Sequence, residues 1–198
     1  VSEREISRHF HLIGQYLNSY LVVQKDDQLL LIDQHAAHER IIYQQLRQEK
    51  EENKAGEKII QLTIPVNLDL PLEWRDRMPT LIDILTQAGF HLESLGDNSY
   101  VLRAIPFFLE KNFKSNDLFD LLEQLIEESS EPEAENNDLV LKVIACHRSI
   151  KAKQSLSRPE MEELLHLWIT TDGAQYCPHG RPTAISFDRK QLEKGFLR

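Results

Sequence analysis

The residues best suited to chemistry lie in a short stretch that runs from Asp33 to Glu39. If a helix opens at residue 33 or 34, His35 and Glu39 lie one turn apart on the same face, so an imidazole and a carboxylate can converge on one metal ion. Asp33 would then lie at a strand end or at the helix N-cap, aimed at the same place. The alternative is a capped, charged helix whose apolar residues, Ile41 and Leu46 among them, simply pack inward.

A second stretch places a thiol and an imidazole two residues apart, at Cys177 and His179. Both side chains can face one ion if the chain turns there, and the neighbouring Pro178 and Gly180 favour a turn. A Pro/Gly turn with a buried thiol and an unrelated histidine explains the same residues about as well, because cysteine is among the most buried residue types.

A third stretch contains Cys146, in the middle of a predicted helix and beside His147. A single helical cysteine is more often a core residue than a ligand. Adjacent residues on a helix point in different directions, so we expect His147 to support a site or to lie on the surface.

Taken together, the three stretches offer a mixed set of oxygen, nitrogen and sulfur donors: Asp33, His35, Glu39, Cys146, Cys177 and His179. Such a set suits zinc and tolerates manganese or other divalent ions. Two ions about 3.5 to 4 Å apart would clamp the attacking and leaving oxygens of a phosphodiester. Three basic residues near these stretches could hold DNA phosphates: Arg148, Lys151 and Arg181.

The elements that must position these residues alternate between strands and helices, which predicts an α+β fold. A buried strand over 29–32 delivers the chain to Asp33, and a helix follows from Gln34 to about Glu52. Before this strand, the sequence predicts a strand over 12–24 with a bulge or turn at Gly14. After the helix, it predicts an edge strand over 59–67 interrupted by Pro65, a helix over 72–88 stopped by Gly89, a hairpin formed by 90–95 and 100–105, and a helix over 117–128. The last predicted elements are a helix over 138–153, a helix from Arg158, a strand over 183–187 and a short C-terminal helix. Two polar segments, 51–58 and 129–137, are predicted to be boundary connections.

Composition narrows the class of protein. With 198 residues and 41% hydrophobic residues, the chain can bury a sizeable core without disulfides, and its two cysteines suit a reducing compartment. No apolar run approaches the roughly 18 residues of a membrane span and no signal peptide opens the chain, so we expect a cytoplasmic location. The net charge of -9 excludes a general nucleic-acid binder. Any contact with DNA must use a local basic patch or a tether to another domain.

At these residues the chain resembles the C-terminal domain of the MutL family of DNA mismatch repair proteins, in particular the members that nick DNA themselves. The family signature is Asp-Gln-His-Ala, two residues, Glu, four residues, Glu; here it reads Asp33 to Ala36, then Glu39, then Gln44. Two further blocks, 145–152 and 177–182, are similar to family blocks and follow in the same order, so the resemblance extends across about 150 residues.

The resemblance implies a dimerisation lobe built from both chain ends, 1–57 and 138–198, and an inserted external lobe over 58–137. It implies a metal-dependent endonuclease that nicks one strand of duplex DNA, with Zn²⁺ or Mn²⁺ held by residues that match the family's metal site. These residues are the six donors named above, of which Asp33, His35 and Glu39 would be catalytic. ATP would act only through an N-terminal ATPase domain that this chain does not include.

The resemblance also implies partners: a second copy of the chain, duplex DNA that the isolated domain binds weakly, the mismatch-sensing protein MutS and the replication sliding clamp, in a nucleoid-associated setting. In the family, a short Gln-containing segment of the external lobe docks on the clamp. The residues here that resemble it are Gln61, Leu62, Ile64 and Pro65. They are about as well explained as ordinary residues of a strand.

One position departs from the family pattern. Gln44 replaces the second glutamate with a neutral amide, which cannot neutralise a cation, so we expect it to support the site rather than bind metal. Two other functions remain open: a dimerisation and partner-binding module with a structural zinc and no cleavage, and a thiol enzyme that uses Cys146 and Cys177.

Overall fold

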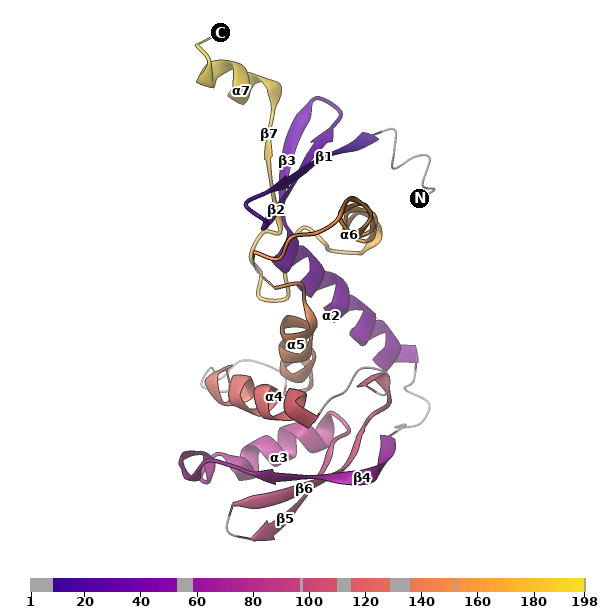
Figure 1. The fold of residues 1–198 in the computed structure, drawn as a ribbon, viewed down its shortest axis with the longest axis vertical. Coiled ribbons are helices and arrows are strands. Elements are labelled where there is room, and N and C mark those ends of the chain that lie inside the picture. The colour runs from indigo at the N-terminus through magenta and orange to yellow at the C-terminus, as the bar shows by residue number, and fades with distance from the viewer. Residues whose placement is uncertain are drawn as a thin grey trace. The chain divides into compact units, whose positions relative to one another are not determined.

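The structure is a computed structural model, and it describes residues 9–52, 59–96, 98–109, 115–128, 136–151 and 153–197. The chain divides into two compact units, Val1–Gln44 with Arg148–Arg198, and Gln45–His147. Figure 1 shows the elements of each unit, and the first unit contains both chain ends. Most of the two predicted boundary segments, residues 53–58 and 129–135, lies outside the described residues.

The first unit is built on an antiparallel sheet with strand order β1-β2-β3-β7. Its strands are β1 (Phe10–Tyr16), β2 (Tyr20–Lys25), β3 (Gln28–Asp33) and β7 (Ala184–Phe187), and a short helix α7 (Arg189–Gly195) follows β7. The predicted bulge is confirmed, because the register between β1 and β2 shifts between Leu12 and Gly14.

The single strand predicted over 12–24 is wrong, because the chain forms a hairpin there. Leu17 and Asn18 both have a φ of 51°, and two consecutive left-handed residues make a tight turn between β1 and β2. In most such turns, a glycine in the sequence predicts the turn. This turn contains no glycine, so the apolar pattern predicts one continuous strand.

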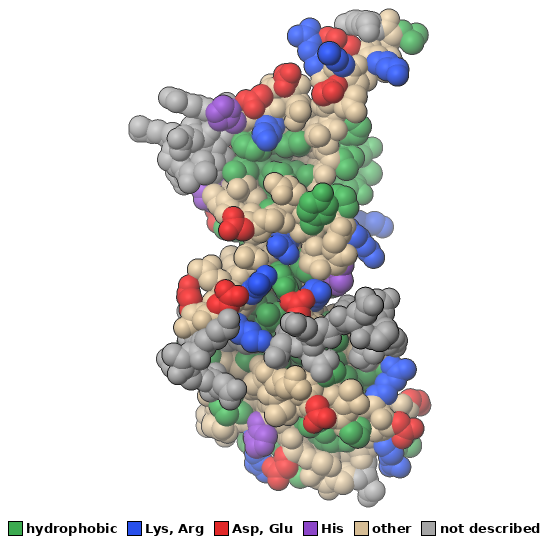
Figure 2. All heavy atoms as spheres, turned by 180° about the vertical axis from the view of Figure 1, so that it is seen from behind, with side chains coloured by type: hydrophobic (Ala, Val, Ile, Leu, Met, Phe, Trp, Pro, Cys, Tyr) green, Lys and Arg blue, Asp and Glu red, His purple; other side chains and the backbone are tan. Residues whose placement is uncertain are grey.

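The inner face of this sheet forms the core of the first unit together with two helices, α2 (Gln34–Glu52) and α6 (Arg158–Thr170). The buried cluster is made of residues from the strands and both helices, including Leu21, Ile32, Ile41 and Leu164. Because side chains alternate between the faces of a strand, the intervening residues lie on the other face. Figure 2 shows hydrophobic side chains gathered over the strands of this unit.

The second unit contains an antiparallel sheet with strand order β4-β6-β5, formed by β4 (Ile59–Asp69), β5 (His91–Gly96) and β6 (Ser99–Pro106). Its helices are α3 (Met78–Gln87), α4 (Ser115–Glu128) and α5 (Asn136–Arg148), with 3-10 turns η1 (Leu72–Trp74) and η2 (Phe107–Leu109). Helix α3 packs on β5 and on α4. The predicted hairpin, the edge position of β4 and the helix stop at Gly89, whose φ is 93°, are confirmed.

Two predicted helices begin or end at other residues. The helix predicted over 72–88 is a 3-10 turn followed by α3, which begins at Met78 with Pro79 in its first turn, where the missing N–H of proline costs nothing. The helix predicted to reach residue 153 ends at Arg148. Beyond it, the backbone N–H and carbonyl of Ile150 bond to histidines of α2 instead of continuing the helix.

Within the described residues, no helix is long and apolar enough to cross a membrane.

Candidate metal centre

Asp33 is the last residue of β3 and caps helix α2. Its Oδ1 accepts hydrogen bonds from the backbone N–H groups of His35 and Ala36, both at 3.0 Å. Satisfying two free N–H groups in this way is the usual role of an aspartate at an N-cap. The position predicted for Asp33, at a strand end and a helix start, is therefore confirmed, and one carboxylate oxygen is committed to the helix.

Gln34 is fully buried and ties the start of α2 to two other segments. Its Nε2 donates to the carbonyl oxygens of Asn18, at 2.7 Å, and Gln154, at 2.9 Å, while its Oε1 accepts from Gln15 Nε2 at 2.6 Å. This role was not predicted from the sequence. The available signal was a long polar side chain directly after a continuous apolar strand.

Two histidines of α2 hold the backbone of the segment that follows α5. The Nδ1 of His35 lies 2.8 Å from the carbonyl oxygen of Ile150 and 2.9 Å from the hydroxyl of Ser149. The Nδ1 of His38 accepts from the N–H of Ile150 at 2.9 Å. Burial, and then the neighbouring His35, lower the pKa of His38, so its ring is neutral at pH 7 and able to accept this bond.

The bond to Ile150 also fixes the orientation of the His35 ring. A carbonyl oxygen only accepts, so Nδ1 donates the proton of this bond and Nε2 is the nitrogen left for another partner. Histidines that bind metals commonly donate their other N–H to a carbonyl in this way, which fixes the tautomer and the ring orientation.

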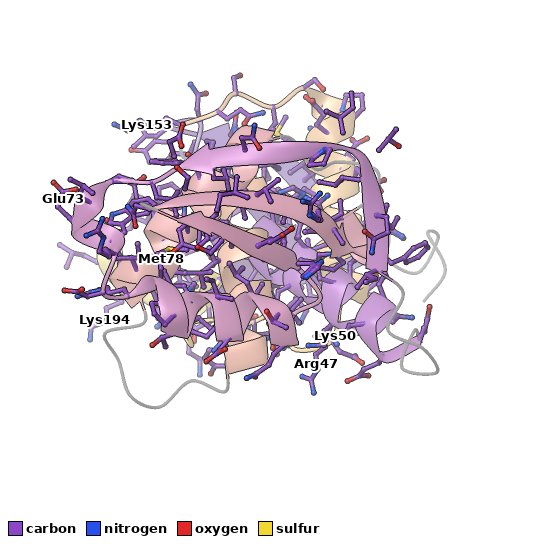
Figure 3. The ribbon with its side chains drawn as sticks, turned by 90° about the horizontal axis from the view of Figure 1, so that it is seen from below. Arg47, Lys50, Glu73, Met78, Lys153 and Lys194 are labelled. Atoms are coloured by element: carbon purple, nitrogen blue, oxygen red, sulfur yellow. The ribbon has the colours of Figure 1, made fainter. Side chains whose placement is uncertain are left out.

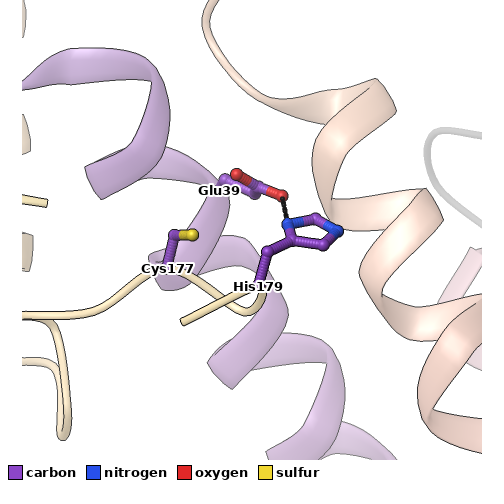
Figure 4. Close-up of side chains that lie close together, drawn as sticks. All are labelled: Glu39, Cys177 and His179. Atoms are coloured by element: carbon purple, nitrogen blue, oxygen red, sulfur yellow. Dashed lines mark ion pairs between the residues drawn. The ribbon is translucent and has the colours of Figure 1, made fainter. Parts of the chain in front are cut away.

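The centre of the site is a group of three side chains, Glu39 from α2 and Cys177 and His179 from the turn after α6 (Figure 4). Their ligand atoms all lie within 4.8 Å of one another. Glu39 and Cys177 are buried, and His179 is exposed at the rim. An ion bound tetrahedrally at roughly 2.0 to 2.3 Å from nitrogen, oxygen and sulfur ligands would place those ligands about 3.3 to 3.8 Å apart, within this limit.

The carboxylate of Glu39 supports the assignment. Its Oε1 lies 3.0 Å from Nδ1 of His179, which is an ion pair only if the imidazole is protonated, and this buried oxygen accepts no hydrogen bond within the described part of the chain. A buried carboxylate oxygen without a hydrogen bond is costly. A cation between Glu39, Cys177 and His179 would satisfy it, so the residues present fit a metal ion.

Backbone hydrogen bonds give the turn that carries Cys177 its shape. The N–H of Cys177 donates to the carbonyl of Arg181 at 2.8 Å, and the N–H of Gly180 donates to the carbonyl of Cys177 at 2.9 Å. Tyr176 and Pro182 form a β-bridge at the base of the turn. The predicted turn is confirmed, and it presents the thiol and the imidazole on the same side.

Thr183 anchors this turn to the start of α2. It is fully buried, and its N–H donates to the carbonyl of Gln175 at 2.9 Å. Its hydroxyl donates to the carbonyl of Ala174, which also accepts from Trp168 Nε1 at 3.0 Å. Its own carbonyl accepts from the N–H of Asp33 at 2.8 Å. The cap of α2 and the Cys177 turn are therefore joined by one buried threonine.

The structure gives different positions to the other predicted site residues. Asp33 and His35 lie at the start of α2 and are not members of the group of three. Cys146 lies on α5, in the second compact unit, so its role as a ligand stays a prediction. Its neighbour His147 places Nε2 3.7 Å from the carboxylate of Asp120.

The predicted phosphate-binding residues and the departure at position 44 are also located. Lys151 and Arg181 are exposed, and Arg148 is half-buried at the end of α5. Gln44 is half-buried on α2, and its Oε1 is buried with no hydrogen-bond partner among the described residues.

The fold and the site define an α+β domain with a buried carboxylate, a buried thiol and an exposed imidazole that could together hold a metal ion. Residues 13–156 match the family described as the MutL C terminal dimerisation domain, and the chain belongs to this family. The resemblance to the MutL C-terminal domain, drawn from the sequence motifs, is thereby confirmed at the level of the family.

Similar proteins carry one name. The chain is 34% identical over 188 residues to the DNA mismatch repair protein MutL of Trichlorobacter lovleyi, which covers 94% of this chain and 32% of that protein. It is 36% identical over 188 residues to MutL of Heliobacterium modesticaldum and 32% identical over 187 residues to MutL of Clostridium botulinum, in each case across 94% of this chain and 28% of the relative. The chain thus spans about a third of the length of these relatives.

Proposed function

We propose that this chain is the metal-dependent endonuclease and dimerisation domain of a DNA mismatch repair protein, and that it nicks one strand of duplex DNA. The observation that supports this most strongly is the group of Glu39, Cys177 and His179, with its buried carboxylate oxygen that accepts no hydrogen bond. The relatives that cover 94% of the chain are each named as DNA mismatch repair proteins.

In this proposal, Glu39, Cys177 and His179 hold a divalent ion, which would be Zn²⁺ or Mn²⁺ by its donors. When bound, such an ion activates water and neutralises charge on the phosphodiester. His35 would offer Nε2 to a divalent ion, since its Nδ1 is held by the Ile150 carbonyl. Asp33 would offer the oxygen that does not cap α2.

Exposed cations would hold the DNA backbone. Lys151 and Arg181 are exposed on the same unit as the metal group and can neutralise phosphates. The net charge of -9 opposes this attraction, so binding of duplex DNA by this chain alone would be weak and salt-sensitive.

We further propose that the outer face of the four-stranded sheet is the dimer interface, and that the unit built from both chain ends is the dimerisation lobe. Large apolar side chains on this unit are exposed: Ile13 is 53% exposed, Tyr16 57% and Ile185 53%. In the register of the sheet, Leu31 lies opposite both Val22 and Ile185, so the apolar row continues across three strands. Monomeric proteins rarely expose such a continuous apolar face.

We also propose that the segment formed by Gln61, Leu62, Ile64 and Pro65 docks on the replication sliding clamp. The pairing of β4 with β6 is interrupted between Gln61 and Val66, so residues 62–65 leave the ladder at an edge strand. Ile64 is 81% exposed there. An extended edge segment with an exposed apolar side chain is suited to a groove on another protein. An Ile64→Ser variant should lose clamp binding in a pull-down while keeping its circular dichroism spectrum; unchanged binding would exclude the segment.

Nicking of supercoiled plasmid in the presence of Mn²⁺ tests the catalytic proposal. The wild-type chain, with the sliding clamp supplied, should convert supercoiled plasmid to the open circular form, and Asp33→Asn should not. If both proteins bind the metal and are equally inert, the chain is a dimerisation and partner-binding module with a structural ion. If activity survives chelation but is lost on thiol alkylation, the thiol-enzyme alternative holds.

A further inference from the structure

Arg40 follows Glu39 on α2, and its side chain reaches the turn that leads to Cys177. A Cβ atom built on Gly173 would lie 2.6 Å from Nη2 of Arg40, closer than Cβ atoms approach other heavy atoms in proteins. The guanidinium therefore lies directly against the bare backbone of Gly173. At this point the helix that carries Glu39 meets the segment that carries Cys177 and His179.

Gly173 is linked to Cys177 by a short, hydrogen-bonded stretch. Its carbonyl accepts from the N–H of Tyr176 at 3.2 Å, and the buried Ala174 between them is fixed by the indole of Trp168. The φ of Gly173 is 67°, a conformation that side chains disfavour. A displacement of Gly173 would consequently be passed to Cys177 rather than absorbed in a free loop.

Packing holds the guanidinium of Arg40, which forms no ion pair with any residue that the structure describes. It lies 5.4 Å from the ring centroid of Tyr43, which is itself buried, a distance that fits a cation–π contact. Its Nε is buried and has no hydrogen-bond partner among the described residues. Leaving a buried N–H of a cation unpaired is unfavourable.

We propose that Arg40 is a positioning residue of the metal centre: its guanidinium, seated on Gly173, sets the separation between Glu39 on α2 and the Cys177–His179 turn. The inference rests on the proposed function, because it takes these three residues as metal ligands. The Arg40 side chain sets how closely the turn approaches α2, and glycine at 173 provides the space for it. Neither residue binds the ion.

Binding of Co²⁺ tests this directly, since a cobalt–thiolate bond gives a charge-transfer absorption that reports the contact with Cys177 itself. Equilibrium dialysis gives the affinity in parallel. We expect Arg40→Ala and Gly173→Ala each to weaken Co²⁺ binding about 10- to 100-fold and to diminish the charge-transfer band, as substitutions that support metal ligands commonly do. Arg40→Lys keeps the charge but lacks the planar group, and should not restore the affinity.

The double variant separates contact from general damage. Arg40→Ala removes the group that a Gly173→Ala methyl would strike, so the combined loss should be clearly smaller than the two single losses together. Two controls are available. Arg47→Ala removes an exposed arginine of the same helix (Figure 3), and Gly96→Ala replaces a glycine with a φ of 95° and open space around it. Both should bind Co²⁺ like wild type.

Wild-type Co²⁺ affinity and an unchanged band in Arg40→Ala and Arg40→Lys would overturn the proposal, even if the variants melt at lower temperature. Additive losses in the double variant would overturn it as well. The proposed metal site fails separately: in that case wild type itself shows no charge-transfer band, and Cys177→Ala does not differ from it.

Discussion

Replacing the buried Gln34 should destabilise the first compact unit far more than replacing an exposed polar residue of the same helix would. Gln34 makes three side-chain hydrogen bonds, to Asn18, Gln154 and Gln15, in a fully buried position. Each such bond contributes about 1 kcal/mol net, and a buried partner left unpaired costs more. The carbonyl of Gln154 retains a bond from Gln15 Nε2, which limits the damage there. We therefore expect a loss of about 2 to 3 kcal/mol in the free energy of unfolding.

Urea unfolding followed by circular dichroism measures this loss. Gln34→Met keeps most of the side-chain volume but none of the polar atoms, so it isolates the hydrogen bonds from packing. Gln48→Met is the matched control, because Gln48 lies on the same helix, is exposed and, among the described residues, bonds only the nearby Glu52. It should cost less than about 0.5 kcal/mol. A loss below about 1 kcal/mol for Gln34→Met would refute the assignment of Gln34 as the tie between these segments.

Three further predictions concern Glu160, Glu39 and Ile185. Hydrogen bonds from the hydroxyl and then the N–H of Ser157 lower the pKa of Glu160, so the stability that ionised Glu160 contributes is complete above its unfolded pKa and is lost as the pH falls through the lower, folded pKa. Thermal melts should accordingly show Glu160→Ala melting below wild type at pH 7, with the difference shrinking below pH 4.5; a constant difference would contradict this. A divalent ion at a hundred times its Kd should stabilise wild type by about 2.7 kcal/mol, and Glu39→Gln should lose most of that gain in the same melts; an equal gain in both would exclude Glu39 as a ligand. Ile185→Asp should shift the chain from dimer to monomer in light scattering at micromolar concentration, whereas a dimeric variant would place the interface elsewhere.

The parts of the fold that sequence patterns predicted are those with local causes. The hairpin over 91–106 and the helix that begins at Arg158 carry their own turn, stop or cap residues. The turn at Leu17 and Asn18 was not predicted, because its two residues with left-handed backbone conformation are not glycines. The end of α5 was not predicted, because histidines of α2 that are distant in sequence form hydrogen bonds with the backbone of Ile150.

The candidate site shows the same division. The sequence alone predicted the types of donor, their order along the chain and the helix that Asp33 caps. The selection of Glu39, Cys177 and His179 as the closest group required tertiary structure, since about 140 residues separate the helix from the turn. Gln34 and Arg40 were missed for a related reason: each acts through contacts with segments remote in sequence.

The central claim, that Glu39, Cys177 and His179 hold the ion that cuts DNA, is tested most directly by measuring metal content and plasmid nicking on the same samples of wild type and Glu39→Gln. Wild type should bind the ion and convert supercoiled plasmid to open circles in proportion to its metal content. Glu39→Gln should bind less and nick little, while keeping its fold. Equal metal content and equal nicking in the two proteins would contradict the claim.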